Sequence, residues 1–377
     1  MKKIEIKGQC QNKFNKIKDI LYDEIMCEHS VGSAFAVYQD GNALVDLYGG
    51  YTDKNKSREW NRDTIVPVHS VGKGIVSLCL ILLISRNELS LDSKVSEYWP
   101  KFGNNGKVNI RLRTLMSHQA GLYGWRDKLS QEDLYNWDYC VNLLAEQRPF
   151  HKPGEETCYH AKTIGFLSGE IIKRITNKTV GEFINDEFVK NNFLSCFIGT
   201  PNKYHSTISE VFSSINYNND KNKNKSEDKY IKYGFNNPPT NRSLYSDKKW
   251  IEAEIPSLNC YANASSLAQI YDLFINSNSC SILNSNSLDE ALMIESNRMD
   301  YIMRLPIKWS PVGLIIGGGK LFGNSERAFG HTGSGGSIAF ADPDQKLSIS
   351  YTTNTLSKSL IDDRRALNLV SKLYKLI

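Results

Sequence analysis

Apolar and polar positions alternate in two stretches near the start of the chain, one on each side of Asp40-Gly41. They belong to the segment SAFAVYQDGNALVDLYGGY, which begins at Ser33. Alternation with a period of two is typical of a half-buried strand, and an Asp-Gly pair is a strong turn signal. We therefore expect an antiparallel hairpin near the N-terminus.

The pattern changes at Ser70, where the segment SVGKGIVSLCLILLI begins and runs to Ile84. It is apolar on nearly every side, which predicts a central helix covered by other elements and ending near Arg86-Asn87. The middle of the chain also reads as largely helical. Its predicted helices span Ile110–Ser117, Glu132–Gln147 and Thr163–Ile175.

The last eighty residues return to strand patterns in three short runs, ERAFGHTGS, GGSIAFADP and KLSISYTTN. Turn residues from Asp342 to Gln345 separate the last two runs, and a helix is expected over Ile361–Leu376. Strands at both ends of the chain with helices between them predict an α+β fold of the α/β sandwich type. One antiparallel sheet would be built from the two termini and flanked by helices.

This division predicts a sheet-containing domain from residues 1–100 and 295–377 and an inserted, mostly helical domain from residues 101–294. Between residues 216 and 249 the composition shifts, and NYNNDKNKNKSEDKY is nearly devoid of apolar residues. A segment with so little to bury is expected to be a flexible, solvated surface insertion.

Composition and charge exclude several classes of function. The 377 residues are 40% hydrophobic, enough for sizeable cores, and 46 basic against 41 acidic residues give a formal charge of only +5. Neither nucleic acid nor an acidic membrane is an expected partner. The N-terminus lacks the apolar core of a secretory signal and Val76–Ile84 is too short to span a bilayer, so a cytoplasmic location is expected.

The eight cysteines are scattered, with no C-x-x-C pair and no histidines at zinc spacing. We expect reduced thiols, mostly buried, and no metal.

Ser70 and Lys73 carry the first chemical signal. A serine hydroxyl is a weak nucleophile unless a nearby base accepts its proton, and residues three apart share a helix face. Burial lowers a lysine pKa and makes a neutral amine available as that base. The same S-x-x-K spacing also occurs at Ser226–Lys229 and Ser246–Lys249, but only Ser70 opens an apolar helix. The alternative is that Lys73 simply reaches solvent.

Two further stretches have chemical potential. KPGEETCYHAKTIGFLSGEII sets Tyr159 after a Pro-Gly turn and just before a helix, where a phenol can be aimed into a cleft. FGHTGSGGSIAF sets His331 on a strand followed by small residues, which let a substrate approach the backbone. Taken singly, Tyr159 could equally be a core tyrosine and His331 an ordinary strand residue.

Together and in this order, these motifs resemble the serine β-lactamase and penicillin-recognising superfamily, whose signature includes S-x-x-K and K-T-G. The class C β-lactamase branch and its family VIII carboxylesterase relatives are most similar. The resemblance runs from the hairpin to the last strand. It includes LMSHQAGL, from Leu115 to Leu122, and EIPSLNCYANASSLAQIY, from Glu254.

The resemblance implies that Ser70 is the acylated nucleophile, Lys73 its proton partner and Tyr159 a residue that moves protons. His331 stands where the K-T-G lysine would be. The oxyanion hole would be the backbone N–H groups of Ser70 and Ser334. Further residues expected to bind substrate are Thr332, Gly333 and Trp125.

Two departures from the family pattern bear on the substrate. Ala161 replaces the asparagine of Tyr-x-Asn, which removes an amide that contacts a β-lactam side chain. His331 replaces a lysine and is largely neutral near pH 7, which weakens a site for a carboxylate. The expected function is a serine hydrolase of small acyl esters without metal or organic cofactor. The alternatives are a β-lactamase, a D-amino acyl peptidase, an acyltransferase, or a non-catalytic binding or scaffold protein of the same fold.

Overall fold

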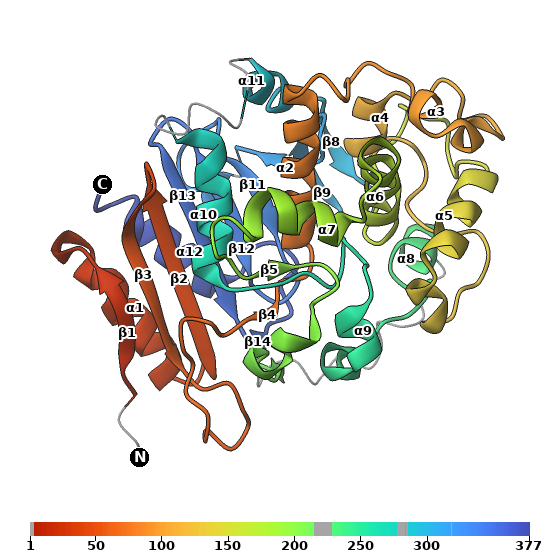
Figure 1. Cartoon of the computed structure of the whole chain (residues 1–377). Helices are drawn as coiled ribbons and strands as arrows, with labels where there is room; N and C mark the ends of the chain where they lie inside the picture. The colour runs from red at the N-terminus through yellow and green to blue at the C-terminus, as the bar shows by residue number, and fades with distance from the viewer. Residues whose placement is uncertain (1–3, 215–227, 277–282, 284–285, 318) are drawn as a thin grey trace.

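A nine-stranded antiparallel sheet forms the centre of the protein. The computed structural model describes residues 4–214, 228–276, 283, 286–317 and 319–377. Figure 1 shows strands from the N-terminus lying beside strands from the C-terminus. In spatial order the strands are β1 (Ile6–Cys10), β3 (Asn42–Gly50), β2 (Gly32–Gln39), β13 (Leu347–Thr353), β12 (Ile338–Asp342), β11 (Phe329–Thr332), β10 (Ile315–Ile316), β9 (Leu305–Trp309) and β8 (Ser296–Asp300).

The sheet confirms the predicted fold class. β2 and β3 form the expected hairpin, which turns at Asp40 and Gly41, both with positive φ. β13 pairs with β2 and thereby joins the two ends of the chain. The last helix, α12 (Arg364–Leu373), is shorter than predicted because it begins only after Asp363, whose side chain accepts a hydrogen bond from the backbone N–H of Arg365.

Helices cover both faces of the sheet (Figure 1). α1 (Asn15–Met26) and α12 cover one face of the sheet. Phe35 and Val37 of β2 point from that face into the same hydrophobic cluster as the two helices. α10 (Ala264–Ile275) packs on the other face with the intervening residues Ala36 and Tyr38. This alternation follows from the period of two along a strand, so both faces of β2 are buried.

The apolar helix predicted from Ser70 is α2 (Val71–Ser85), and every one of its residues is buried. It packs against β11 and against α6 (Thr163–Thr176), the helix expected over 163–175. A Cβ added at Gly74 would lie 2.2 Å from the hydroxyl oxygen of Tyr271 and 3.3 Å from Cβ of His331. The glycine therefore lets α2 approach the strand that carries His331.

Short helices and strands make up the rest of the described chain. The stretch predicted as one helix from Glu132 to Gln147 begins with a 3-10 turn and becomes α-helical only at Trp137, where Asn136 caps the helix. The remaining elements are α3 (Val95–Tyr98), α4 (Leu112–Met116), α5 (Trp137–Glu146), α7 (Val180–Ile184), α8 (Lys229–Gly234), α9 (Lys248–Glu252), α11 (Ser287–Ala291), β4 (Val66–Pro67), β5 (Cys196–Phe197), β6 (Phe212–Ser213), β7 (Tyr261–Ala262) and β14 (Thr355–Leu356).

The prediction of a flexible, solvated insertion between residues 216 and 249 is partly wrong. Residues 215–227 lie outside the described residues, but 228–249 are folded and contain α8, a 3-10 turn at Arg242–Ser246 and the start of α9. Apolar and aromatic residues of this part, which the high overall polarity of the segment concealed, pack into the core. The predicted boundaries at residues 101 and 294 stay a prediction. α10, which belongs to the predicted helical domain, packs directly on the sheet.

Among the residues that the structure describes, no helix is long and apolar enough to cross a membrane. Seven of the eight cysteines are described, and each is a free thiol. Cys280 lies outside the described residues.

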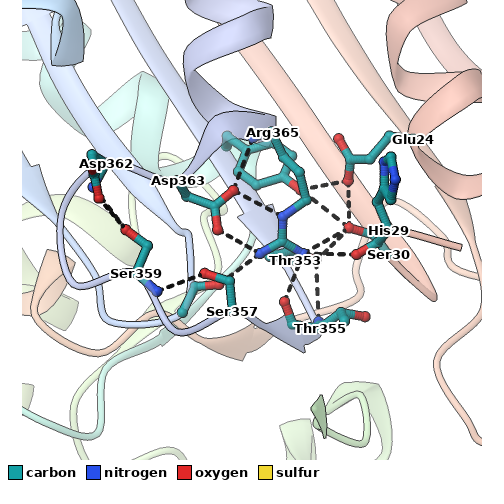
Figure 2. Close-up of polar contacts among 12 residues, drawn as sticks. Glu24, His29, Ser30, Thr353, Thr355, Ser357, Ser359, Asp362, Asp363 and Arg365 are labelled. Carbon is teal, nitrogen blue, oxygen red and sulfur yellow. Dashed lines mark hydrogen bonds and ion pairs between the residues drawn. The ribbon is translucent and has the colours of Figure 1, made fainter. Parts of the chain in front are cut away.

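A buried charge cluster ties the two chain ends together (Figure 2). Arg365 of α12 is 9% exposed and forms a two-pronged ion pair with Asp363, at 2.9 and 2.8 Å. Its other N–H groups donate to the backbone oxygens of Thr355 and Gly335. On the far side, Glu24 of α1 accepts hydrogen bonds from Ser30 and Tyr351. Through the carbonyl of Gly335, the cluster holds the loop that follows β11.

Replacing Arg365 with methionine should lower the free energy of unfolding by roughly 3–5 kcal/mol, because Asp363 would remain buried without its partner. Urea unfolding followed by far-ultraviolet circular dichroism measures the change. Arg327→Ala is the control, since Arg327 forms exposed ion pairs with Asp289 and Asp344, which water screens. Equal stability of the two variants would contradict this role of Arg365.

Candidate active site

Ser70 lies at a sharp turn between β4 and α2. It is the N-cap residue of α2, and His69 before it has a φ of 51°. A non-glycine residue in this region is strained and is held there by its surroundings. The turn places the Ser70 hydroxyl at the positive end of a fifteen-residue helix, where developing negative charge is stabilised.

Lys73 lies one turn into the helix and does not reach solvent. Its Nζ is 2.8 Å from Ser70 Oγ and donates a hydrogen bond of 2.9 Å to the backbone oxygen of Ser257. Its side chain is 5% exposed, and this burial holds the pKa of Lys73 well below its usual value of 10.5. Lys73 is therefore oriented by a carbonyl, and its buried ammonium gives up a proton more readily than an exposed one would.

Tyr159 brings the third group to Ser70. Its hydroxyl donates a hydrogen bond of 2.9 Å to Ser70 Oγ, and its ring stacks on Trp309 with 5.7 Å between ring centroids. Burial raises the pKa of Tyr159 above its usual value near 10. The phenol therefore keeps its proton at neutral pH, next to an amine whose pKa burial lowers.

Two histidines hold the backbone around Tyr159. His118 accepts a hydrogen bond at Nδ1 from the backbone N–H of His160, and its backbone oxygen accepts one from Cys158. His160 in turn donates to the backbone oxygen of Cys158 and accepts from the N–H of Leu122. Both side chains are buried, and their hydrogen bonds hold the backbone on both sides of Tyr159.

The end of β11 forms the opposite wall. His331 Nδ1 bonds the carbonyl oxygen of Thr332 at 2.7 Å, and a carbonyl can only accept, so Nδ1 carries the proton. Burial and the nearby Lys73 lower the pKa of His331 to about 3. His331 is thus neutral at pH 7, with the lone pair of Nε2 buried and without a hydrogen-bond partner among the described residues.

Close packing at Gly333 positions this wall against the nucleophile. A Cβ on Gly333 would lie 2.2 Å from the backbone oxygen of Val68, two residues before Ser70. Only a glycine lets the strand end approach so closely. Ser334, the next residue, is exposed, and neither its backbone N–H nor that of Ser70 bonds another residue in the described part of the chain. Two backbone donors therefore remain available on facing segments.

These side chains line a surface-accessible cavity. Ser70, Tyr159, His331, Thr332 and Ser334 contribute to its wall. Much of the remaining lining is apolar: Phe235, Leu258, Met303, Ile307, Ile315 and Leu360. The cavity thus offers a mainly apolar space next to the serine.

The segment assigned to a solvated insertion contributes Phe235, Thr240 and Tyr245 to this cavity. Lys162, also in the lining, was missed in the sequence analysis. It is 3% exposed, its Nζ donates to the backbone oxygens of Phe235 and Pro238, and burial lowers its pKa to about 7. Its position three residues after Tyr159, at the start of a helix, is the sequence feature that could have identified Lys162 as a site residue.

Trp125 was expected to bind substrate, but it lies away from the cavity. Its side chain is fully buried, donates a hydrogen bond of 3.1 Å to the backbone oxygen of Cys140 and packs edge-on against Phe166. It does not line the cavity, because the chain after Gly121 turns inward toward α5 and α6. The sequence position near the LMSHQAGL stretch suggested proximity but could not show this direction.

Comparison with known proteins agrees with this geometry. A family model described as Beta-lactamase matches residues 21–372. The chain is 27% identical over 339 residues to Esterase/beta-lactamase LipL of Mycobacterium tuberculosis, covering 88% of this chain and 78% of that protein. A family VIII carboxylesterase structure has a TM-score of 0.91 and 28% identity over 99% of this chain and 100% of its own.

A second solved structure, a penicillin-binding protein homologue from Caulobacter crescentus, has a TM-score of 0.90 and 26% identity. It covers 99% of this chain and 100% of its own. The family model alone spans far more than half of the chain, and each of the two solved structures matches 99% of it. The protein therefore belongs to the Beta-lactamase family, with esterases among its similar relatives.

Proposed function

We propose that this protein is a serine hydrolase that cleaves small acyl esters through an acyl-enzyme intermediate. The observation that carries the proposal is the pair of contacts at Ser70 Oγ, 2.8 Å to the buried amine of Lys73 and 2.9 Å to the phenol of Tyr159. An amine whose pKa is lowered by burial and a phenol that keeps its proton are suited to accept and return a proton on one face of the nucleophile.

In the first half-reaction, Ser70 Oγ bonds to the acyl carbon while its proton passes to Lys73. The tetrahedral oxyanion would accept hydrogen bonds from the N–H groups of Ser70 and Ser334. One such donor commonly accounts for a 10²–10³-fold effect on kcat. Collapse breaks the ester C–O bond, and the departing alkoxide takes a proton from Tyr159, which Lys73 restores.

In the second half-reaction, water attacks the acyl carbon of the Ser70 ester. Lys73 and Tyr159 take the proton of the water and return it to Ser70 Oγ as the carbon–oxygen bond breaks. The products are a carboxylic acid and the starting enzyme. The proton that leaves with the alcohol in the first half-reaction is replaced from water in the second, so the full cycle leaves the proton count of the site unchanged.

Three features favour an uncharged ester. His331 is neutral at the position of the family's lysine, Ala161 lacks the amide of the family's asparagine, and the cavity lining is largely apolar. A carboxylate-bearing substrate would lose solvation there without a fixed positive partner on β11. Relatives that carry the name esterase are consistent with this choice.

A second candidate keeps the chemistry and changes the substrate to a β-lactam, a D-amino acyl peptide, or an alcohol or amine that receives the acyl group. Lys162, a buried cation donor in the same cavity, is the observation that favours it. Turnover of nitrocefin comparable to that of p-nitrophenyl butyrate would support it. If the protein were instead a non-catalytic scaffold of the same fold, a fluorophosphonate would not label Ser70.

We also propose a cytoplasmic location for the protein.

Ser70→Ala should reduce hydrolysis of p-nitrophenyl acetate and butyrate by roughly 10⁴-fold or more, because the acyl-enzyme can no longer form. Ser246→Ala is the matched control, because Ser246 is the first residue of another S-x-x-K sequence but is exposed on the surface. This variant should retain full activity. Unchanged turnover in Ser70→Ala would refute the assignment.

The pH profile of kcat/KM should show an acid limb set by Lys73. Its pKa is lowered, so the limb lies below 10.5, and activity falls as pH decreases and the amine gains a proton. His331, with a pKa of about 3, should not titrate between pH 5 and 9. The limb should therefore persist in His331→Asn. If the acid limb disappeared in His331→Asn, it would belong to the histidine instead.

Tyr159→Phe should lower kcat by about 10²–10⁴-fold, because the phenol that gives a proton to the departing alkoxide is lost.

His331→Lys should shift the preference toward substrates with a carboxylate, because it adds a positive charge beside Ser70. The ratio of kcat/KM for a carboxylate-bearing penicillin to that for p-nitrophenyl butyrate measures the shift. We expect the ratio to rise by about tenfold, equivalent to ~1.4 kcal/mol. His331→Gln, which adds no charge, should leave the ratio unchanged, and an equal rise in both variants would contradict the electrostatic explanation.

A further inference from the structure

Three side chains of the types that bind metals converge on the segment before Tyr159. They are His151, Glu156 and Cys158, and one nitrogen, one oxygen and the sulfur lie within 4.8 Å of one another. None of the three lines the catalytic cavity. They follow no familiar zinc spacing in the sequence, and only the fold around the Pro153-Gly154 turn brings them together.

The ring of His151 presents a free lone pair. Its Nδ1 bonds the carbonyl oxygen of Lys152 at 3.0 Å, and since a carbonyl only accepts, Nδ1 carries the proton. Nε2 is then the unprotonated nitrogen, and it is buried with no hydrogen-bond partner in the ranges that the structure describes. Histidines that bind metals typically donate their other N–H to a carbonyl or carboxylate in this way.

The other two groups are also oriented. The Cys158 thiol is fully buried and lies 3.7 Å from Oε2 of Glu156, to which it donates. The same carboxylate oxygen accepts a hydrogen bond of 2.9 Å from the hydroxyl of Tyr230 in α8. Glu156 and His151 are partly exposed, which gives an ion a path from solvent.

Backbone contacts outside the cluster fix the spacing of the three groups. The N–H of Phe150 donates to Gly121, that of Gly154 to Gln119 and that of Cys158 to His118, at 2.8–2.9 Å. The segment is thus held to a neighbouring loop at its start, at its turn and at its end. A site assembled before the ion arrives loses less conformational freedom on binding.

We propose that His151, Glu156 and Cys158 bind a divalent cation of the zinc type, with water as a fourth ligand. Thiolate, imidazole and carboxylate are the ligands of Zn²⁺, whereas Ca²⁺ and Mg²⁺ take mostly oxygen ligands. Tetrahedral coordination requires ligand atoms about 3.5 Å apart, so the cluster contracts by about 1 Å. Cys158 releases its proton on binding. The dication and the two negative ligands then sum to zero charge.

The test uses the full-length protein freed of metal by a chelator and titrated with Co²⁺. We expect one ion per chain, a thiolate-to-cobalt absorption band in the near ultraviolet, and release of about one proton at pH 7. Cys158→Ser should lose the band. Cys140→Ser, which removes another buried thiol that is not part of this cluster, should keep it.

Two further variants test the site without replacing the buried Cys158. His151→Gln changes a partly exposed residue and should weaken Zn²⁺ binding, measured by calorimetry, by about 100-fold or more. Tyr230→Phe removes the hydrogen bond to Glu156 and should weaken it by about tenfold. Absence of the band at stoichiometric Co²⁺ in the unmodified protein, its survival in Cys158→Ser, or unchanged affinity in His151→Gln would overturn the proposal.

Discussion

The chemistry of this protein depends on the exclusion of water from Lys73. An ammonium buried without an anionic partner is costly, and the amine gives up its proton more readily instead. The surrounding structure satisfies the amine without a carboxylate, through the carbonyl of Ser257 and the oxygen of Ser70. A nearby carboxylate would have stabilised the charged form and removed the base. The all-apolar helix α2 is therefore part of the proposed catalytic arrangement as well as the core.

Close approach between elements distant in sequence sets the rest of the site. Gly74 and Gly333 bring α2 and β11 together, and the stacking of Tyr159 on Trp309 fixes the phenol over Ser70. The cluster around Arg365 holds the loop that follows β11. These contacts link the sheet, which unites the two chain ends, to the helical region that carries Tyr159. A small shift in any of them would move a proton donor or acceptor away from the reacting oxygen.

Much of the fold and part of the site could be predicted from local patterns. The hairpin, the apolar helix and the C-terminal strands were readable because each shows one clear period. The polar insertion was misjudged after residue 228, since scattered aromatic residues such as Phe235 carry no period yet pack into the core. Trp125 was misplaced for a related reason: chain position gives proximity but not the direction of a side chain.

The sequence by itself determined which groups can react: a serine and a lysine one turn apart on an apolar helix, a tyrosine before another helix and a histidine in place of a lysine. Their periods and spacings are local, so they are visible without coordinates. Only the tertiary structure decided that Tyr159 reaches Ser70, that His331 is buried and neutral, and that His151, Glu156 and Cys158 converge. Distances between segments and the loss of water around a charge arise from packing, and no local pattern encodes them.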